Sequence, residues 1–330
     1  MTKILSESAL PNIPWQERPP GYKDVLWRWT GNPVIGSNPI PCSSRIYNSA
    51  VVAYDGAFLG VFRADHRDFI PQLHLGRSAD ALNWQIEPEP IAFLDQSGVP
   101  VRSNYSYDPR IVKIEDAYYI TWCTDYHGPT IGVARTEDFR TFLRLENAFL
   151  PFNRNGVLFP RRFDDKYLML SRPSDQGHTP FGDIFLSESP DLCHWGRHRH
   201  VMAPGTSGWW DDTKVGAGPV PIETSAGWLL LYHGVANSCN GYIYSMGGAI
   251  LDCQDPARVL YRCSEYLLQP ETDYECVGLV PNVLFPCATL CDAATGRLAL
   301  YYGAADNYTA VAFGYIGEII EHIIERSTSS

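Results

Sequence analysis

The sequence predicts an all-β protein, a five-bladed β-propeller with a short C-terminal helix. A unit of two short apolar strands joined by a tight polar turn recurs five times in the 330-residue chain. Successive copies begin roughly 50–65 residues apart, the spacing that is typical of four-stranded propeller blades. Long helical patterns are absent between the copies, which disfavours a parallel α/β fold.

Each predicted blade begins with one hairpin. The five hairpins span residues 48–65, 108–125, 155–175, 216–234 and 281–306. Their turns, such as Asp55-Gly56 and Glu115-Asp116, have the composition of tight β-turns. A third strand is expected after each hairpin, for example at 73–84, 130–142, 183–195 and 246–255.

The two ends of the chain are expected to meet in one blade. The segment 27–35 and the last strand, near 310–315, together supply the missing strands and close the ring. After them, Ile316, Ile319, Ile320, Ile323 and Ile324 share one face of a helix. This stripe predicts a helix at about 316–326 that either docks on its own propeller or forms a subunit contact.

No low-complexity linker divides the chain, so residues 1–330 are expected to form a single catalytic domain with a short N-terminal extension at about 1–14. The net charge of −11 argues against a general nucleic-acid or membrane-surface binder. The chain has no apolar run of membrane-spanning length and no signal-peptide pattern at its start. Nine scattered cysteines then indicate reduced thiols and a cytoplasmic protein.

The stretch 104–110, NYSYDPR, is the centre of the functional argument. An aspartate between aromatic residues at the start of a strand suits a site that binds sugar and transfers a proton. Asp108 can act as the general acid, and the ring of Tyr107 can contact a sugar face. The alternative is that Asp108 only caps a turn before Pro109.

Polar residues recur at the same end of the predicted blades. Asn48, Asp108 and Asn155 occupy equivalent positions at the start of three hairpins. The hairpins end in a polar set: Arg63, Asp65, Asp125, His127, Arg172, Asp175, His233 and Asp306. Because these residues come from separate repeats and converge on one channel mouth, the pattern favours a functional site over isolated turns or core histidines.

Two kinds of charge are expected at that mouth. Four aspartates could bind sugar hydroxyls or transfer protons: Asp65, Asp108, Asp175 and Asp306. A basic group could bind an oxyanion: Arg63, Arg154, Arg172, Lys214 and His233. The competing interpretation is a set of structural salt bridges. No metal site is expected, since His194, His198 and His200 lack zinc-site spacing, and no nucleotide motif is present.

At these residues the sequence resembles glycoside hydrolase family 130, the β-mannoside phosphorylases. The resemblance runs from about Pro14 to Glu321 and is carried by YDPRI, WCTDYHGPTIGVA, PFNRNGVLFPRR, LSRPSDQGHTPFGDIF, KVGAGPVPIET, LLLYHGV, SCNGYIYS, VPNVLFP and YYGAAD. It is greatest to the branch that acts on β-1,4-mannooligosaccharides and β-1,4-mannosyl-N-acetylglucosamine. The family fold is a five-bladed propeller.

The resemblance implies roles for individual residues. It implies that Asp108 is the catalytic acid. It implies phosphate contacts for Arg154, Arg172, Lys214, His233 and Tyr244. It implies contacts around the mannosyl and acceptor subsites for Asn48, Ser49, Arg63, Asp65, Asp175, His178 and Asp306.

The expected reaction is reversible, inverting phosphorolysis of a β-1,4-mannoside to α-mannose 1-phosphate and the shortened sugar. Phosphate is then a co-substrate and no cofactor is expected. The alternatives are a β-mannosidase that uses water and a non-catalytic sugar-binding propeller. The acceptor stays open among N-acetylglucosamine, mannose and glucose. The C-terminal stripe, together with the assemblies of relatives, predicts a homo-oligomer of up to six subunits.

Overall fold

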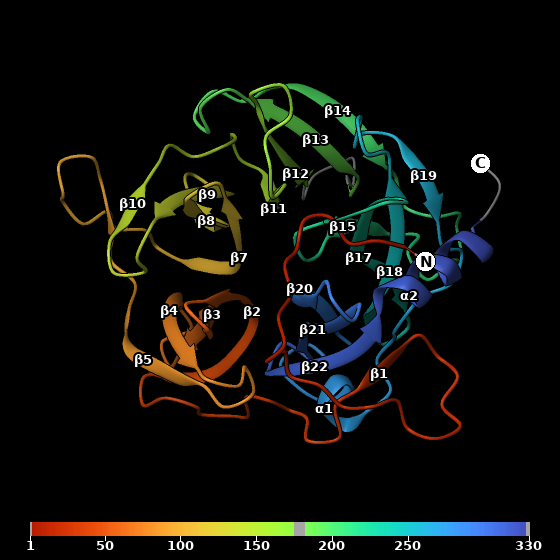
Figure 1. Ribbon diagram of the computed structural model, residues 1–330. Coiled ribbons are helices and arrows are strands. Elements are labelled where there is room, and N and C mark those ends of the chain that lie inside the picture. Colours follow the sequence, from red (N-terminus) through yellow and green to blue (C-terminus); the bar gives the residue numbers. More distant parts are fainter. Residues whose placement is uncertain (1, 175–181, 328–330) are drawn as a thin grey trace.

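Five β-sheets stand around a central axis in the computed structural model, which describes residues 2–174 and 182–327 (Figure 1). Blades I to III are consecutive in the chain, and their strands are antiparallel except for β6, which pairs in parallel with β10 at the edge of blade II. Blade I contains β2 (Ser43–Tyr54), β3 (Ala57–His66), β4 (Pro71–Ser78) and β5 (Gln85–Pro90). Blade II contains β6 (Phe93–Leu94), β7 (Ser106–Ile114), β8 (Ala117–Asp125), β9 (Pro129–Thr136) and β10 (Phe142–Arg144). Blade III contains β11 (Asn153–Leu158), β12 (Tyr167–Pro173), β13 (Ile184–Ser189) and β14 (Gly196–Met202).

Blades IV and V complete the ring. Blade IV contains β15 (Lys214–Ala217), β16 (Ile222–Thr224), β17 (Gly227–Ser238), β18 (Gly241–Leu251) and β19 (Val259–Arg262). Blade V contains β20 (Leu284–Asp292), β21 (Arg297–Ala304), β22 (Tyr308–Tyr315) and β1 (Leu26–Arg28). A short helix, α1 (Asp273–Cys276), precedes β20. The predicted propeller, its hairpins and their third strands are therefore confirmed.

The predicted closure of the ring is also confirmed. Strand β1 pairs antiparallel with β22, and Trp27 lies opposite Phe313. Because the first strand completes the last blade, the ring is held shut by backbone hydrogen bonds as well as by packing. Trp27 is fully buried between blades V and I.

Each pair of neighbouring blades encloses its own apolar cluster. Between blades I and II, for example, Leu59 and Val61 pack with Ile120 and Trp122. Alternate residues of each strand face one neighbour or the other, which explains why the strands read as nearly continuous apolar runs. The polar ends of the inner strands are left to the channel.

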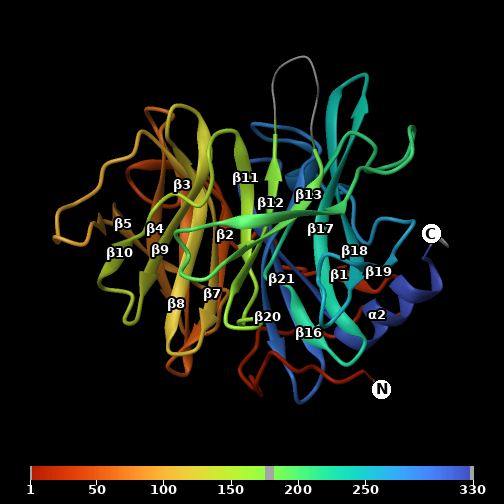
Figure 2. The ribbon, with the colours of Figure 1, turned by 90° about the horizontal axis from the view of Figure 1, so that it is seen from above.

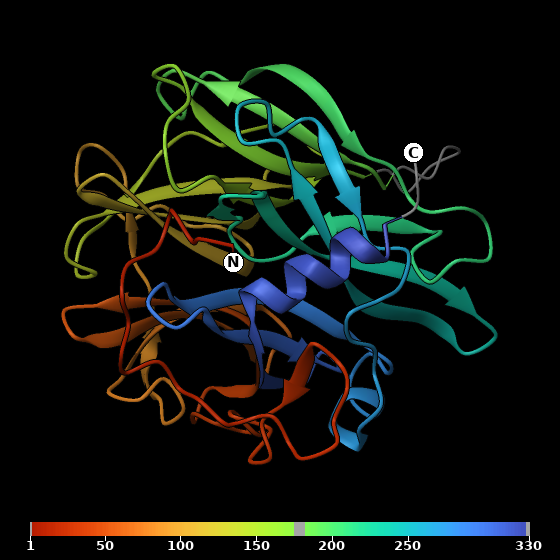
Figure 3. The ribbon, with the colours of Figure 1, turned by 45° about the vertical axis from the view of Figure 1, so that its right-hand side comes forward.

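Helix α2 (Ile316–Glu325) lies across the outside of blades IV and V, where it contacts β18, β19 and β22 (Figure 3). Ile316, Ile319, Ile320 and Ile323 are at most 1% exposed, whereas Ile324 is 39% exposed. Of the two interpretations of the isoleucine stripe, docking on the chain's own propeller is the one observed. The stripe therefore gives no support to a subunit contact.

The N-terminal segment crosses the end of the propeller opposite to the tip of the β17–β18 hairpin (Figure 2). The backbone N–H of Leu5 donates to the Glu223 carbonyl at 2.8 Å, and that of Ala293 donates to the Ser8 carbonyl at 3.2 Å. The segment thus ties blades IV and V together at that end. No helix of the described residues has the length and apolar character needed to cross a membrane.

Candidate active site

Three inner strands carry a β-bulge at the same place. The pairing register shifts between Tyr47 and Ala50 in β2, and equivalent shifts occur in β7 and β11. Asn48, Asp108 and Asn155 lie in these bulges with φ of 48°, 53° and 55°. Asn and Asp adopt this left-handed conformation more readily than other non-glycine residues, and a bulge redirects the side chain. The three positions are therefore equivalent, as predicted.

A cavity of about 720 Å³ opens where the bulged strands meet. It receives residues from all five blades, so it lies at the end of the central channel. Among its lining residues are most of the predicted site: Asn48, Arg63, Tyr107, Asp108, Arg154, Arg172, Lys214, Tyr244 and Asp306. No individual role was predicted for the other seven lining residues, of which only Asn155 was expected at this end of the blades: Asn155, Ser174, Thr213, Tyr242, Val280, Val283 and Phe285.

The Asp108 carboxylate is held through one of its oxygens. Asn48 Nδ2 donates to Asp108 Oδ1 at 2.9 Å, and Arg63 Nη1 donates to the same oxygen at 2.8 Å. The Asp108 side chain is 14% exposed, so it is largely shielded but still reaches the cavity. Both donors fix the direction of the carboxyl group, and Oδ2 is the oxygen left for a ligand.

Arg63 is held in place by a second layer. Its Nε donates to Asp65 Oδ1 at 3.0 Å, and Tyr47 OH donates to Asp65 Oδ2 at 2.8 Å. The guanidinium also lies over the rings of Tyr47 and Tyr107, at 4.1 Å and 5.0 Å from their centroids. Asp65 is only 7% exposed and does not line the cavity. Its contacts are those of a residue that positions Arg63.

Three cations that act on one another, Arg154, Arg172 and Lys214, line the same cavity. Arg154 donates from Nε to Tyr107 OH at 3.3 Å and from Nη1 to Ser174 Oγ at 2.5 Å. Lys214 Nζ lies over the rings of Tyr242 and Tyr244, at 4.7 Å and 5.2 Å from their centroids. Burial, followed by the charges of Arg172 and Arg154, lowers the pKa of Lys214 to about 8. Such crowding of like charges is relieved by a bound anion.

No salt bridge between described residues involves Arg154, Arg172 or Lys214. The competing interpretation, a structural pair between Arg172 and Asp175, falls on a residue outside the described ranges. His178 lies outside them as well. The three cations nevertheless contrast with Arg63, whose charge is matched by Asp65 and Asp108.

His233 lies behind the cavity, not in its wall. It is fully buried, and its Nε2 accepts a hydrogen bond from Arg172 Nη1 at 2.8 Å. An arginine can only donate, so Nε2 carries no proton and the imidazole is neutral. Burial, and then the positive charges of Arg172, Lys214 and Arg110, hold the His233 pKa well below its ordinary value. In this structure His233 orients Arg172. A direct contact with phosphate would require it to reach past that side chain.

A further predicted residue, Ser49, also lies outside the cavity wall, whereas Asp306 lies in it. Ser49 is buried, and its hydroxyl donates to the Tyr47 carbonyl at 3.2 Å. It therefore supports the bulge and does not face the cavity. Asp306 does line the cavity, with a pKa raised to about 6. Burial is the main cause, and Arg63 opposes the increase while Asp108 and Asp65 add to it.

Comparison with known proteins adds a second line of argument. The model of glycoside hydrolase family 130, described as β-1,4-mannooligosaccharide phosphorylase, matches residues 7–325. A β-1,4-mannooligosaccharide phosphorylase of Ruminococcus albus is 53% identical over 334 residues, which cover 99% of each chain. A 1,2-β-oligomannan phosphorylase of Thermoanaerobacter is 32% identical over 82% of this chain and 89% of its own.

Solved structures agree with the fold. The β-1,2-mannobiose phosphorylase of Listeria innocua, in complex with β-1,2-mannobiose, superposes with a TM-score of 0.79 at 26% identity. The superposition covers 90% of this chain and 99% of that chain.

Proposed function

The chain belongs to glycoside hydrolase family 130, and we propose that it is a phosphorylase that cleaves β-1,4-linked mannosides with inorganic phosphate. The linkage is supported by the relatives. Identity is 53% to the Ruminococcus albus enzyme named for β-1,4-mannooligosaccharides, and 32% to the Thermoanaerobacter enzyme named for 1,2-β-oligomannan. The family resemblance carried by the YDPR segment and the basic residues points to the same reaction.

One observation carries the assignment of phosphate as co-substrate. A single cavity brings the Asp108 carboxylate together with Arg154, Arg172 and Lys214. None of these three cations takes part in a salt bridge between described residues. Arginine forks and a lysine ammonium are suited to a phosphate dianion. An inverting hydrolase would instead need a second carboxylate to activate water on the face opposite the acid. Asp306 also lines the cavity, but after burial the main charges that shift its pKa are those of Arg63, Asp108 and Asp65, so it belongs to the group around the acid. Phosphate is already a nucleophile and needs only to be held.

The proposed step is a single displacement with inversion. A phosphate oxygen held by the cations attacks C1 of the mannosyl unit as the bond from C1 to the glycosidic oxygen breaks. Asp108 supplies the proton that the leaving oxygen takes up, relayed through the mannosyl 3-hydroxyl as the family resemblance implies. The products are α-mannose 1-phosphate and the shortened sugar. The scheme requires no cofactor.

The decisive experiment is to incubate the protein with β-1,4-mannobiose in the presence and absence of inorganic phosphate. We expect mannose 1-phosphate to form only when phosphate is present. Equal release of free mannose in both reactions would identify a hydrolase. Sugar binding without any cleavage would identify a non-catalytic propeller.

The acceptor sugar is tested by the reverse reaction. Mannose 1-phosphate is offered with N-acetylglucosamine, mannose or glucose, and the phosphate released is measured. We expect mannose or a mannooligosaccharide to be accepted, because of the greater identity to the β-1,4-mannooligosaccharide enzyme.

We also propose a cytoplasmic location, supported by nine free thiols. The homo-oligomer stays a prediction and now rests on the family resemblance alone, since α2 packs on its own propeller.

A further inference from the structure

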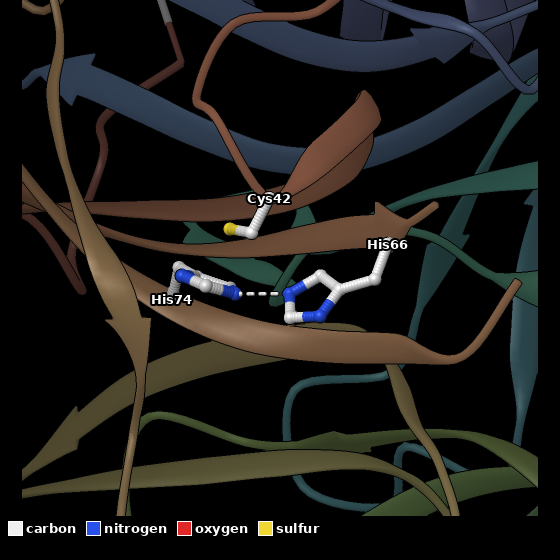
Figure 4. Close-up of side chains that lie close together, drawn as sticks. All are labelled: Cys42, His66 and His74. Carbon is white, nitrogen blue, oxygen red and sulfur yellow. Dashed lines mark hydrogen bonds between the residues drawn. The ribbon is translucent and has the colours of Figure 1, made fainter. Parts of the chain in front are cut away.

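Outside the cavity, blade I brings a cysteine and two histidines together (Figure 4). Cys42 lies just before β2, His66 ends β3, and His74 lies in β4. These positions are 24 and 8 residues apart in the chain, a spacing that matches no zinc motif, and they were not among the histidines considered in the sequence analysis. Antiparallel pairing of β2, β3 and β4 brings them side by side.

The three potential ligand atoms converge on one point. The Cys42 thiol and one ring nitrogen of each histidine lie within 4.8 Å of one another. His66 Nε2 and His74 Nε2 are 2.8 Å apart. His74 is fully buried, whereas Cys42 and His66 are partly exposed, so one side of the group is open to solvent. It is the one group of three such ligands found among the described residues.

The hydrogen bonds fix the orientation of the buried ring. His74 Nδ1 lies 2.9 Å from the Glu87 carbonyl oxygen, which can only accept, so Nδ1 carries the proton. In the neutral ring, His74 Nε2 therefore carries a lone pair, which accepts a hydrogen bond from His66 Nε2. A histidine that binds a metal through one nitrogen usually donates its other N–H to a backbone carbonyl or a carboxylate.

We propose that Cys42, His66 and His74 form a binding site for a divalent transition-metal ion, with Zn²⁺ as the best match. One thiolate and two imidazoles are ligands that Zn²⁺ prefers, and three protein ligands leave a fourth tetrahedral position for water. Two nitrogens bound at about 2.0–2.1 Å to a tetrahedral ion lie about 3.3–3.4 Å apart. The partly exposed His66 ring therefore has to move by about half an ångström.

The proton balance of binding is simple. The His66 Nε2 proton, now donated to His74, moves to Nδ1 of the same ring, and the Cys42 thiol releases its proton to solvent. Binding therefore releases one proton and oxidises nothing. The ion would connect the segment before β2 to the β3–β4 hairpin. His66 directly follows Asp65, so the same ion would anchor the end of β3 that carries Arg63 and Asp65.

The test uses Co²⁺ as a spectroscopic substitute for Zn²⁺, added to the full-length protein under reducing conditions without chelator. We expect one equivalent to bind with tetrahedral d–d absorption and a near-ultraviolet thiolate-to-cobalt band. Zn²⁺ should displace it. Cys42→Ser should abolish the thiolate band, and His66→Gln should weaken affinity at least 10-fold. Cys239→Ser is the matched control, because Cys239 is an exposed thiol in the β17–β18 turn.

A thermal shift provides a second measurement that does not depend on cobalt spectra. Zn²⁺ at 100 µM should raise the unfolding temperature of the parent and of Cys239→Ser, but not that of Cys42→Ser. Circular dichroism verifies that each variant is folded. The proposal is overturned if the parent binds no Co²⁺ at 100 µM Co²⁺. It is equally overturned if Cys42→Ser retains the thiolate band, because another cysteine would then be the ligand.

Discussion

At the scale of single residues, the donors that hold Asp108 among the described residues reach one of its oxygens, Oδ1. Asn48 and Arg63 both donate to Oδ1, which leaves Oδ2 for a sugar hydroxyl. The substitution Asp108→Asn keeps the size of the side chain and an acceptor for those donors, but it has no proton to transfer. We expect turnover of β-1,4-mannobiose to fall by about 10²–10⁴-fold. Thermal unfolding should show that the fold is retained.

The matched control for this variant is Asp116→Asn in the exposed turn of the same blade. It should have parental activity. If Asp108→Asn retained more than about a tenth of the parental rate, Asp108 would not be the general acid.

Lys214 makes phosphate binding depend on pH. Its pKa is lowered to about 8, first by burial and then by Arg172 and Arg154, so the ammonium is charged below that pH and neutral above it. The KM for phosphate should therefore rise above about pH 8, by up to about 10-fold per pH unit. Lys214→Arg stays charged at every pH tested. Initial rates between about pH 7.5 and 9.5 should show the rise in the parent only, and identical profiles would remove Lys214 from the phosphate site.

Asp306 should destabilise the fold when it is ionised. Its pKa is 3.8 in the unfolded chain and about 6 in the fold, chiefly because of burial. As pH rises through this window the unfolded chain loses its proton first, so the fold loses stability, and the loss is complete above about pH 6. Asp306→Asn should thus be more stable than the parent at pH 7.5, by about 1–3 kcal/mol, and equal to it near pH 4. Urea unfolding at the two pH values measures this difference, and an equal effect at both would contradict it.

At the scale of elements, the bulge in β2 depends on the close approach of β21, the second strand of the neighbouring blade V. A Cβ added to Gly303 in β21 would lie 1.8 Å from Asn48 Oδ1 in β2. Gly303→Ala should therefore displace the Asn48 amide and break its hydrogen bond to Asp108. We expect kcat to fall about 10-fold and stability to fall by about 1–3 kcal/mol. In the control Gly36→Ala, the new Cβ meets no atom within 4 Å. Unchanged kcat in Gly303→Ala would show that Asn48 does not position the acid.

The sequence predicted which strand ends converge, but not the depth of each side chain within them. Arg63, Asp65 and His233 were assigned together because all of them end hairpins. In the structure Arg63 lies in the cavity wall, whereas Asp65 and His233 lie in the layer behind it. Strand alternation could not have separated Arg63 from Asp65, because residues two apart on one strand face the same side. That distinction depends on the tilt of each blade around the axis, which repeat spacing does not encode. The Cys42, His66 and His74 group was missed for a similar reason, since only the pairing of three strands brings it together.

At the scale of the whole molecule, closure of the ring could be predicted because it follows from counting strands. The fifth predicted hairpin and the strand after it supply only three strands of the last blade. The apolar segment around Trp27, which belongs to no other blade, was available as the fourth. The partner of the isoleucine stripe could not be predicted, because an apolar helix face is the same whether it packs on its own chain or on another. The structure provides the surface, formed by Leu267 and Cys263 of blade IV together with Leu26 and Leu298 of blade V.

The docked helix gives the last prediction. Ile320 is 1% exposed and lies within the cluster shared by blades IV and V, whereas Ile324, one turn later, is 39% exposed. Ile320→Ala should lower the free energy of unfolding by about 2–5 kcal/mol through lost burial and a cavity. Ile324→Ala, the same substitution on the same helix, should cost less than about 1 kcal/mol.

Urea unfolding compares the two variants, and mass in solution at micromolar concentration is measured in parallel. If the stripe held subunits together, Ile320→Ala would instead reduce the mass, and the loss of stability would depend on protein concentration. Because the stripe is already covered by its own propeller, we expect the mass to stay the same in the parent and in both variants.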